Sequence, residues 1–478
     1  MKFLHLLAIL ATLLLPSPTL AGGYGFRSVA SRYGAGCVNL QQRIYCYGGY
    51  NSTGSPTNSF MSLDVSRDFT LVEGNVMWDR LEIKGRKYLP WYLSEEDYKP
   101  SANARFGFVP VNNQSSPYII MQGGITEKPG RFTWAYHPDT NEWELLGTNG
   151  EPPNKSCDST VTSTPEGLVV HWGGYVEVFR YYPSEVYILD TKAQNWTNTT
   201  VPKEISEIGS NQYMKGVTGQ NGTIYYIGGV WANATLTYSN GTGEYNLLPN
   251  VMNNIIAYNP RSNTWQRHTT TGTTLPQSRK EFTLNLIPGT NNIIMYGGAD
   301  LSVGKPVEDY VYILDTTKWE WIRKEDPQGM GPGPLASHNA VLVGHNSLFI
   351  LFGKDINGIA RGEFHILDLD YWAWQGSFSL SHQNNVSLPT PTDPPEYDRH
   401  LAAGSIAAIV LGCVAAACIM AWLALFLWRR KKYGKNNGYQ RQSQGQSERS
   451  LHVGSDLASP HGAPPPYEEI YYEVRHAD

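Results

Sequence analysis

The sequence predicts an all-β ectodomain built from six repeats, followed by one transmembrane helix and a disordered cytoplasmic tail. Three observations predict this organisation. A short apolar phrase that ends in Gly-Gly recurs along most of the chain, one long uncharged apolar segment lies near the C-terminus, and the segment after it is polar. Repetition of one phrase is typical of a fold in which each repeat is one structural unit.

The N-terminus is typical of a secretory signal peptide over residues 1–21. Lys2 precedes an apolar run from Phe3 to Leu15, and small residues follow up to Ala21. The run is too short to span a bilayer with ease, and this order of segments is that of a cleaved leader. A buried N-terminal helix is the alternative. We expect cleavage near Gly22 and a secreted ectodomain.

Residues 401–428 are predicted to form a single transmembrane helix. They include no charged residue, and about 20 apolar residues suffice to cross the hydrocarbon core. A basic cluster, residues 429–432, follows at once; such a cluster stays cytoplasmic, and it suits contact with membrane lipid. The sequence therefore predicts a single-pass type I protein, N-terminus outside, in the plasma membrane or the secretory or endosomal pathway. Residues 379–400 would be an extracellular stalk and 429–478 the tail.

The acceptor triplets of N-linked glycans, Asn-x-Ser/Thr, all lie before this helix. They begin at Asn51, Asn113, Asn154, Asn195, Asn198, Asn221, Asn233, Asn240 and Asn385. Any one triplet is frequent by chance, but the one-sided distribution agrees with translocation of the N-terminal part alone. The sequence predicts a glycoprotein.

Five cysteines are few for a secreted chain of 478 residues, so disulfides do not build its core. Cys37 and Cys46 flank a predicted hairpin that turns at Gln41-Gln42, where they face each other at a non-hydrogen-bonded pair. We expect a disulfide between them. Cys157 is then expected to be buried and inert, with an intermolecular partner as the alternative. The formal net charge of −5 argues against nucleic acid as a partner.

The repeated phrase is an apolar strand that ends in Gly-Gly. Its copies end at Gly49, Gly124, Gly174, Gly229 and Gly298, and a sixth copy keeps Gly353 but has Lys354 in place of the second glycine. A strand precedes each phrase, and a further strand follows it, with a tryptophan at Trp143, Trp196, Trp265, Trp321 and Trp374; the first copy, which ends at Trp78, is longer and weaker. Each repeat thus supplies at least three strands, with a mean period of about 57 residues.

This pattern resembles the kelch-repeat family over about residues 32–375. The resemblance implies a six-bladed kelch-type β-propeller over residues 22–378, in which glycines permit sharp turns and Tyr and Trp side chains fill the wedges between blades. Residues 22–28 are expected to supply the outermost strand of the last blade. Insertions at 79–100 and 230–250 are expected to be loops on the propeller faces. The chain also looks like single-pass, membrane-anchored kelch proteins predicted in fungi.

Kelch propellers also include copper oxidases similar to galactose oxidase, whose site needs two His and two Tyr ligands, one Tyr being crosslinked to Cys. The histidines before the predicted helix are scattered at His137, His171, His268, His338, His345, His365, His382 and His400. No two share a metal-ligand spacing, so we expect individual structural or surface histidines, with no metal and no cofactor. A glycosidase-like enzyme with paired carboxylates is a further alternative, because propeller sites assemble from distant loops.

Two groups of carboxylates stand out, and neither predicts catalysis. The charge run at residues 95–97 is typical of a solvated turn. Asp190, Asp315 and Asp368 recur in a Leu-Asp phrase, where an Asp side chain accepts hydrogen bonds from the backbone just ahead. We expect no catalytic residue. A convergent polar pocket at the propeller axis would favour an enzyme instead.

The tail is polar and is expected to be disordered. Near its end Pro464, Pro465 and Tyr467 match the Pro-Pro-x-Tyr motif, which resembles ligands of WW domains. HECT-type ubiquitin ligases are the usual readers in membrane-protein tails. A merely Pro-rich end is the alternative, and a second match in the stalk, residues 394–397, shows that such strings arise by chance. Residues 467–470 also fit a tyrosine-based sorting signal.

The sequence as a whole predicts a membrane-anchored binding protein. Its ligand would be an extracellular protein or carbohydrate bound by loops on one propeller face, and its tail would recruit a WW-domain ubiquitin ligase. The alternative is an extracellular enzyme, a copper oxidase or glycosidase-like, on the same propeller.

Overall fold

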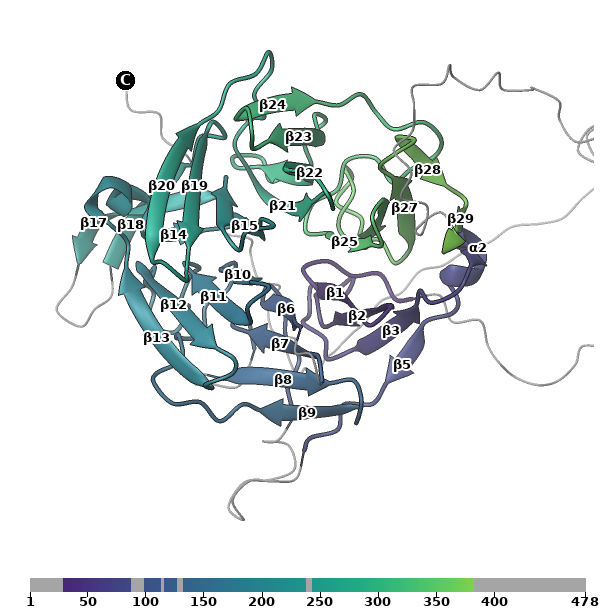
Figure 1. The fold of residues 1–478 in the computed structure, drawn as a ribbon, viewed down its shortest axis with the longest axis horizontal. Helices are drawn as coiled ribbons and strands as arrows, with labels where there is room; N and C mark the ends of the chain where they lie inside the picture. Colours follow the sequence, from purple (N-terminus) through teal and green to yellow (C-terminus); the bar gives the residue numbers. More distant parts are fainter. Residues whose placement is uncertain (1–28, 87–98, 113–115, 127–131, 238–242, 382–478) are drawn as a thin grey trace, which may run out of the picture. The chain divides into compact units, whose positions relative to one another are not determined.

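The computed structural model describes residues 29–86, 99–112, 116–126, 132–237 and 243–381. Six four-stranded antiparallel sheets, numbered 1 to 6 in chain order, lie in a ring (Figure 1). One sheet corresponds to each copy of the Gly-Gly phrase, so the repeat forms a β-propeller, as predicted.

Among these described residues no helix is both long and apolar enough to cross a membrane. The predicted signal peptide, stalk, transmembrane helix and tail lie outside them, apart from residues 379–381 of the stalk.

The first strand of each sheet lies nearest the ring centre and the last lies outermost (Figure 1). Sheet 1 consists of β1 (Gly36–Leu40), β2 (Arg43–Tyr47), β3 (Phe60–Asp64) and β5 (Asp79–Leu81); sheet 2 of β6 (Gly107–Val111), β7 (Tyr118–Gln122), β8 (Thr133–His137) and β9 (Glu142–Leu145). Sheet 3 consists of β10 (Thr160–Ser163), β11 (Leu168–Trp172), β12 (Glu185–Asp190) and β13 (Asn195–Thr200); sheet 4 of β15 (Lys215–Thr218), β16 (Ile224–Ile227), β19 (Asn254–Asn259) and β20 (Thr264–Thr269). Sheet 5 consists of β21 (Arg279–Leu286), β22 (Asn292–Asp300), β23 (Val311–Asp315) and β24 (Glu320–Arg323); sheet 6 of β25 (Asn339–Val343), β26 (Ser347–Leu351), β27 (Phe364–Asp368) and β28 (Ala373–Gln375).

Smaller elements complete the described part. A three-stranded sheet contains β14 (Asn211–Gln212), β17 (Val230–Thr237) and β18 (Gly243–Pro249); β4 (Phe69–Thr70) pairs with β29 (Ser377–Phe378); α2 (Leu71–Gly74) and the 3-10 helix η2 (Lys203–Ile208) are short. The prediction that the two insertions are loops is wrong where the structure describes them. β5 falls in the first insertion, and the β17–β18 hairpin forms the second because Ala232 pairs with Leu247, and Ala234 with Tyr245.

The second glycine of each phrase ties its sheet to the next one. Its N–H donates to a carbonyl of the following sheet's entry segment: Gly49 to Asn103, Gly124 to Ser156, Gly174 to Asn211, Gly229 to Arg279, Gly298 to Leu335, and Gly353 to Arg32. The last bond closes the ring between sheets 6 and 1. These glycines have φ from 71° to 104°. A Cβ on Gly229 would lie 2.3 Å from the backbone nitrogen of Met214, so no side chain fits there.

The sixth phrase lacks the first glycine of the pair and keeps the second. The prediction that Lys354 replaces the second glycine is therefore wrong. Gly353 makes the bond that second glycines make. Lys354 pairs with Ala336, as the residue after each complete phrase pairs in sheets 1 to 3. Phe352 therefore holds the first-glycine position, with φ 61°. Its ring is buried in the adjoining core, which offsets the unfavourable backbone conformation.

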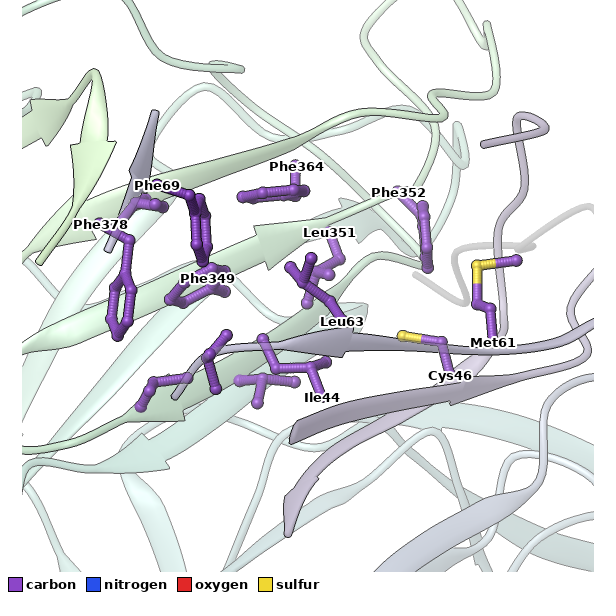
Figure 2. Packing of buried hydrophobic residues seen from close by; sticks show 14 residues of the cluster. Ile44, Cys46, Met61, Leu63, Phe69, Phe349, Leu351, Phe352, Phe364 and Phe378 are labelled. Atoms are coloured by element: carbon purple, nitrogen blue, oxygen red, sulfur yellow. The ribbon is translucent and has the colours of Figure 1, made fainter. Parts of the chain in front are cut away.

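Apolar clusters fill the wedges between neighbouring sheets, as predicted. Each of the six clusters joins two adjacent sheets and receives one tryptophan of the repeat: Trp143, Trp196, Trp265, Trp321, Trp374 and Trp78. The cluster between sheets 6 and 1 packs Phe349 and Phe364 with Ile44 and Leu63 (Figure 2). Segments from the two ends of the propeller thus share one core, which stabilises the closed ring.

A latch of short elements reinforces this closure. Phe378 of β29 pairs with Phe69 of β4, and the N–H of Leu71 donates to the carbonyl of Gly376 at 2.8 Å. Thr70 begins α2 with a reciprocal capping box. β28 holds the outer edge of the described sheet 6, a place predicted for residues 22–28, which lie outside the described residues.

The predicted disulfide hairpin is confirmed. Gln41 and Gln42 form its two-residue turn with φ 52° and 56°, as a type I′ turn requires. Cys37 and Cys46 face each other with Cα atoms 4.2 Å apart and are bonded. Cys157 is buried and free, as predicted. Burial raises the pKa of its thiol to about 12, so the reactive thiolate is scarce at neutral pH.

Candidate functional site

Six residues, one at the beginning of the first strand of each sheet, form a ring at the propeller axis; five stand two residues before the strand and Glu281 is the third residue of β21. The members of this axial ring are Gly34, Arg105, Asp158, Tyr213, Glu281 and Ser337, with φ from 52° to 63°. They lie on the face where the loops after the Gly-Gly phrases emerge. Non-glycine residues are uncommon in this left-handed region, and their clustering at one place points to a functional site.

Backbone hydrogen bonds between sheets hold the axial ring. The N–H of Arg105 donates to the carbonyl of Gly34, Asp158 to Arg105, Tyr213 to Asp158, Ser337 to Glu281, and Gly34 to Ser337, all within 2.8–3.0 Å. The last bond joins sheet 6 to sheet 1, so it parallels the closure made by the Gly-Gly phrases. These bonds join five of the six neighbouring pairs of ring residues, all except Tyr213 and Glu281.

Arg105 and Asp158 form an ion pair within the axial ring. The Nε of Arg105 donates to Oδ1 of Asp158 at 2.8 Å, and a second nitrogen contacts both Oδ2 and the hydroxyl of Tyr213. The amide of Gln212 donates to Asp158 Oδ2 at 3.0 Å. Burial alone would lower the pKa of Arg105, but the charges of Asp158, Tyr213 and Cys157 and the hydrogen bond to Asp158 together raise that pKa above its ordinary value. The Arg105 guanidinium therefore stays charged at physiological pH.

In the part of the axial ring formed by sheets 4 to 6, Glu281 is accompanied by two lysines that are not ring members, Lys215 and Lys280. The hydroxyl of Ser337 donates to Oε2 of Glu281 at 2.6 Å. The ammonium of Lys280 lies 5.5 Å from the ring centroid of Tyr213. Burial lowers the pKa of Lys215, and the charges of Asp158 and Glu281 oppose this shift. Burial also raises the pKa of Tyr213, so its phenol remains protonated.

Two stacked tyrosines extend the axial ring at sheet 1. The ring centroids of Tyr33 and Tyr50 are 5.1 Å apart, and the ammonium of Lys354 lies 4.0 Å from the Tyr33 centroid. Burial raises the pKa of Tyr50, and the nearby charge of Arg105 opposes this shift. We call the axial ring, together with Tyr33, Tyr50, Lys215, Lys280 and Lys354, the mouth. Its cationic side chains, Arg105 and the three lysines, outnumber the carboxylates of Asp158 and Glu281, so the mouth is net positive.

Two described histidines, His171 and His338, are buried and each contacts one hydroxyl group. The ring nitrogen Nε2 of His171 contacts the Ser156 hydroxyl at 3.1 Å, and that of His338 contacts the Thr283 hydroxyl at 2.9 Å. Burial lowers the pKa of His171 to about 4 and that of His338 to about 3.

The remaining histidines have other neighbours. His137 lies beside Glu144, His268 stacks on Trp319, His345 lies near Asp370 and His365 near Trp374, while His382 and His400 lie outside the described residues. Across the described ranges no three His, Cys, Asp or Glu side chains are grouped as a metal site would require.

The recurrent aspartates are turn residues, as predicted. Oδ1 of Asp190, Asp315 and Asp368 accepts hydrogen bonds from the N–H groups two and three residues ahead, at 2.8–3.1 Å. These turns connect the third and fourth strands, on the face opposite the mouth. The charge run at residues 95–97 lies outside the described residues.

The predicted glycan acceptors are dispersed over the propeller. Asn198, Asn221 and Asn233 are exposed, Asn51, Asn154 and Asn195 are partly buried, and Asn113, Asn240 and Asn385 lie outside the described residues, as do Pro464, Pro465 and Tyr467. The amide of Asn154 donates to the Tyr181 hydroxyl at 2.6 Å. Their use as glycan sites stays a prediction.

The sequence alone did not reveal the mouth. The six members of the axial ring share no residue type, so no motif identifies them. A positional signal was available: Gly34 and Arg105 each stand two residues before the glycine that begins the first strand, Gly36 or Gly107. When the repeats are aligned on their first strands, and not on Gly-Gly, these two residues fall at the same position.

Comparisons with known families agree with this fold. A model described as the KLHDC2/KLHL20/DRC7 Kelch-repeats domain matches residues 242–390, and a Kelch motif matches residues 31–68. Together with the repeated sheets, these matches support a kelch-repeat β-propeller protein.

The chain is also similar to named proteins of plants and animals. Acyl-CoA-binding domain-containing proteins 4 and 5 of Arabidopsis thaliana are 22% and 24% identical to it, over 49% and 56% of this chain but only 32% and 39% of their own length. Kelch domain-containing protein 10 of Homo sapiens is 22% identical over 342 residues, which is 68% of this chain and 67% of that protein. The chain thus spans well under half of the two plant relatives.

Proposed function

We propose that this chain is a membrane-anchored kelch-propeller protein whose mouth binds a segment of an extracellular protein. The observation that carries the proposal is the convergence of side chains from six sheets at one net-positive place. Kelch domains generally mediate protein–protein interaction. Because opposite charges steer association and set specificity, we expect the bound segment to carry acidic groups.

Polar side chains that converge at the propeller axis would by themselves favour an enzyme, but the chemistry of the mouth favours binding. Arg105 is committed to Asp158, and Glu281 is bonded to Ser337. The raised pKa of Tyr213 opposes its use as a nucleophile. A binding site needs these side chains fixed in place, and the shared backbone bonds of the ring supply that rigidity.

We also propose that the six sheets are the blades of a closed six-bladed propeller exported by residues 1–21 and anchored by residues 401–428. The Gly353–Arg32 bond and the shared core of sheets 6 and 1 support closure. The uncharged apolar segment, its basic flank and the one-sided distribution of glycan triplets support export and anchoring.

Charge reversal at the mouth tests the binding proposal. Neither Lys280 nor Lys354 belongs to an ion pair within 4.0 Å among the described residues, and Lys280 acts on Asp300 only through its charge, so Lys280→Glu/Lys354→Glu should leave the fold intact. Surface crosslinking followed by quantitative mass spectrometry should recover the partner from cells with the wild-type chain and not from cells with this variant. The matched control is Lys192→Glu/Arg261→Glu, two exposed residues in turns on the opposite face. Equal partner recovery from both variants would refute the mouth as the binding site.

The tail carries a second proposal, that Tyr467 recruits a WW-domain ubiquitin ligase and so limits surface lifetime. Tyr467→Ala should lengthen the lifetime measured by surface biotinylation and chase. Tyr397→Ala, in the stalk copy of the same motif, is the control, because an extracellular motif meets no cytoplasmic WW domain. An unchanged lifetime for Tyr467→Ala would overturn the proposal.

A further inference from the structure

The loop that begins at Tyr50 brings one glycan triplet beside the mouth. Tyr50 and Tyr33 exchange backbone hydrogen bonds at 2.8 and 3.1 Å, and Tyr33 directly precedes Gly34 of the axial ring. A Cβ on Gly34 would lie 3.6 Å from a ring carbon of Tyr50. Asn51 is the next residue, so it is one peptide unit from a side chain that lines the mouth.

The side chain of Asn51 is held in one orientation. Its Oδ1 accepts hydrogen bonds from the N–H of Thr53 at 3.0 Å, the hydroxyl of Thr53 at 2.7 Å and the N–H of Ser55 at 3.0 Å. The loop is closed by bridges from Tyr50 to Tyr33 and to Pro56. All three bonds use the oxygen, and in the described part of the chain no acceptor is paired with Nδ2. An N-linked glycan is attached through that nitrogen, so the turn and the glycan are compatible.

The other described triplets lie elsewhere. Asn154 uses its Nδ2 to bond Tyr181. Asn195 and Asn198 belong to β13, the outermost strand of sheet 3, and Asn233 belongs to β17. Asn221 lies in the β15–β16 turn, on the face opposite the mouth. Of the triplets that the structure describes, the one at Asn51 is the one next to a mouth residue.

We propose that a glycan on Asn51 covers the sheet-1 edge of the mouth and restricts access to it. The contacts form a chain: Asn51 adjoins Tyr50, Tyr50 stacks on Tyr33, and Lys354 lies over Tyr33. A bulky, hydrated sugar at the start of this chain shields Lys354, which lies over Tyr33 beside sheet 1, before Lys280, which lies over Tyr213 at sheet 4. The inference rests on the proposed export and on the proposed role of the mouth, and it makes glycosylation a determinant of which partners enter.

Amine reactivity tests this inference without knowledge of the partner. The full chain is expressed in eukaryotic cells, occupancy of each triplet is read by glycopeptide mass spectrometry, and acetylation rates of Lys354 and Lys192 are measured on the native protein. In Asn51→Asp, which keeps an acceptor oxygen for the turn but removes the glycan site, Lys354 should react several-fold faster and Lys192 at an unchanged rate. Thr53→Ala removes the triplet independently and should give the same result.

The outcomes distinguish failure of this inference from failure of the proposals on which it rests. An unoccupied Asn51 beside occupied triplets elsewhere, or an unchanged Lys354 rate in both variants, would overturn the shielding role alone. If every triplet is unoccupied, the proposed export fails along with it. Loss of the partner in the Lys280→Glu/Lys354→Glu variant concerns the mouth itself and is measured separately.

Discussion

Replacement of Gly124 by alanine should strongly destabilise the propeller. Gly124 is a second glycine of the repeat, with φ 94°. A Cβ there would lie 2.3 Å from Oδ1 of Asn103 and 2.8 Å from the carbonyl oxygen of Ala104. The left-handed conformation costs alanine about 1–2 kcal/mol, overpacking adds about 1–3 kcal/mol, and loss of the Gly124–Ser156 hydrogen bond adds about 1 kcal/mol. We expect a loss of about 3–6 kcal/mol in the free energy of unfolding.

Two further glycines separate these contributions. Gly289 has φ 72°, but no atom of the described residues lies within 4 Å of the place that a Cβ would take, so Gly289→Ala should lose only about 1–2 kcal/mol. Gly147 has no positive φ, and its Cβ would likewise meet no described atom within 4 Å, so Gly147→Ala should be neutral or slightly stabilising. Thermal unfolding followed by tryptophan fluorescence, with the three variants side by side, gives the order. Equal melting temperatures for Gly124→Ala and Gly289→Ala would refute the role of close packing between sheets.

Three other predictions concern the core and the turns. Folding lowers the pKa of His171 from the ordinary histidine value of about 6.5 to about 4, so the stability present above pH 6.5 should fall as the pH drops towards 4, by about 2 kcal/mol at pH 5. Denaturant unfolding at pH 7 and pH 5 should show a smaller loss of stability for His171→Gln than for the wild type. Equal losses in the two proteins would contradict this prediction. Cys37→Ser/Cys46→Ser should lower the free energy of unfolding by about 2–3 kcal/mol, because the disulfide closes a short loop; a reducing agent should destabilise the wild type and not the variant. Asp315→Ala should cost about 1 kcal/mol and Asp315→Asn less, because Asn retains the acceptor for Thr317 and Lys318; identical melting temperatures would argue against the turn role.

The repeat could be predicted from sequence because its physical demands are local. A second glycine must have positive φ and leave no room for a Cβ, so glycine recurs at that position in all six sheets. The disulfide was predictable for the same reason, since a two-residue turn fixes which residues face each other. Tryptophans of the outer strands were assigned correctly to the wedges between sheets.

The parts that sequence reasoning missed depend on contacts between sheets. Phe352 takes a glycine position because its ring finds a core formed by sheets 6 and 1, and no local pattern reports that. The β17–β18 hairpin lies in a segment predicted to be a loop because the interval between its two Gly-Gly phrases is long, whereas Tyr245 and Leu247 lie on the same, partly buried side of β18. The axial ring is defined by backbone bonds from sheet to sheet, which leave residue type free to vary.

A photo-crosslinking amino acid placed at one end or the other of β1 tests the central claim most directly. Tyr33 lies in the mouth, while Gln42 is exposed in the turn on the opposite face of the same sheet. In living cells the chain substituted at position 33 should crosslink to an extracellular protein, and the chain substituted at position 42 should not. Crosslinking of that protein from position 42 but not from position 33 would contradict the assignment of the mouth as the binding site.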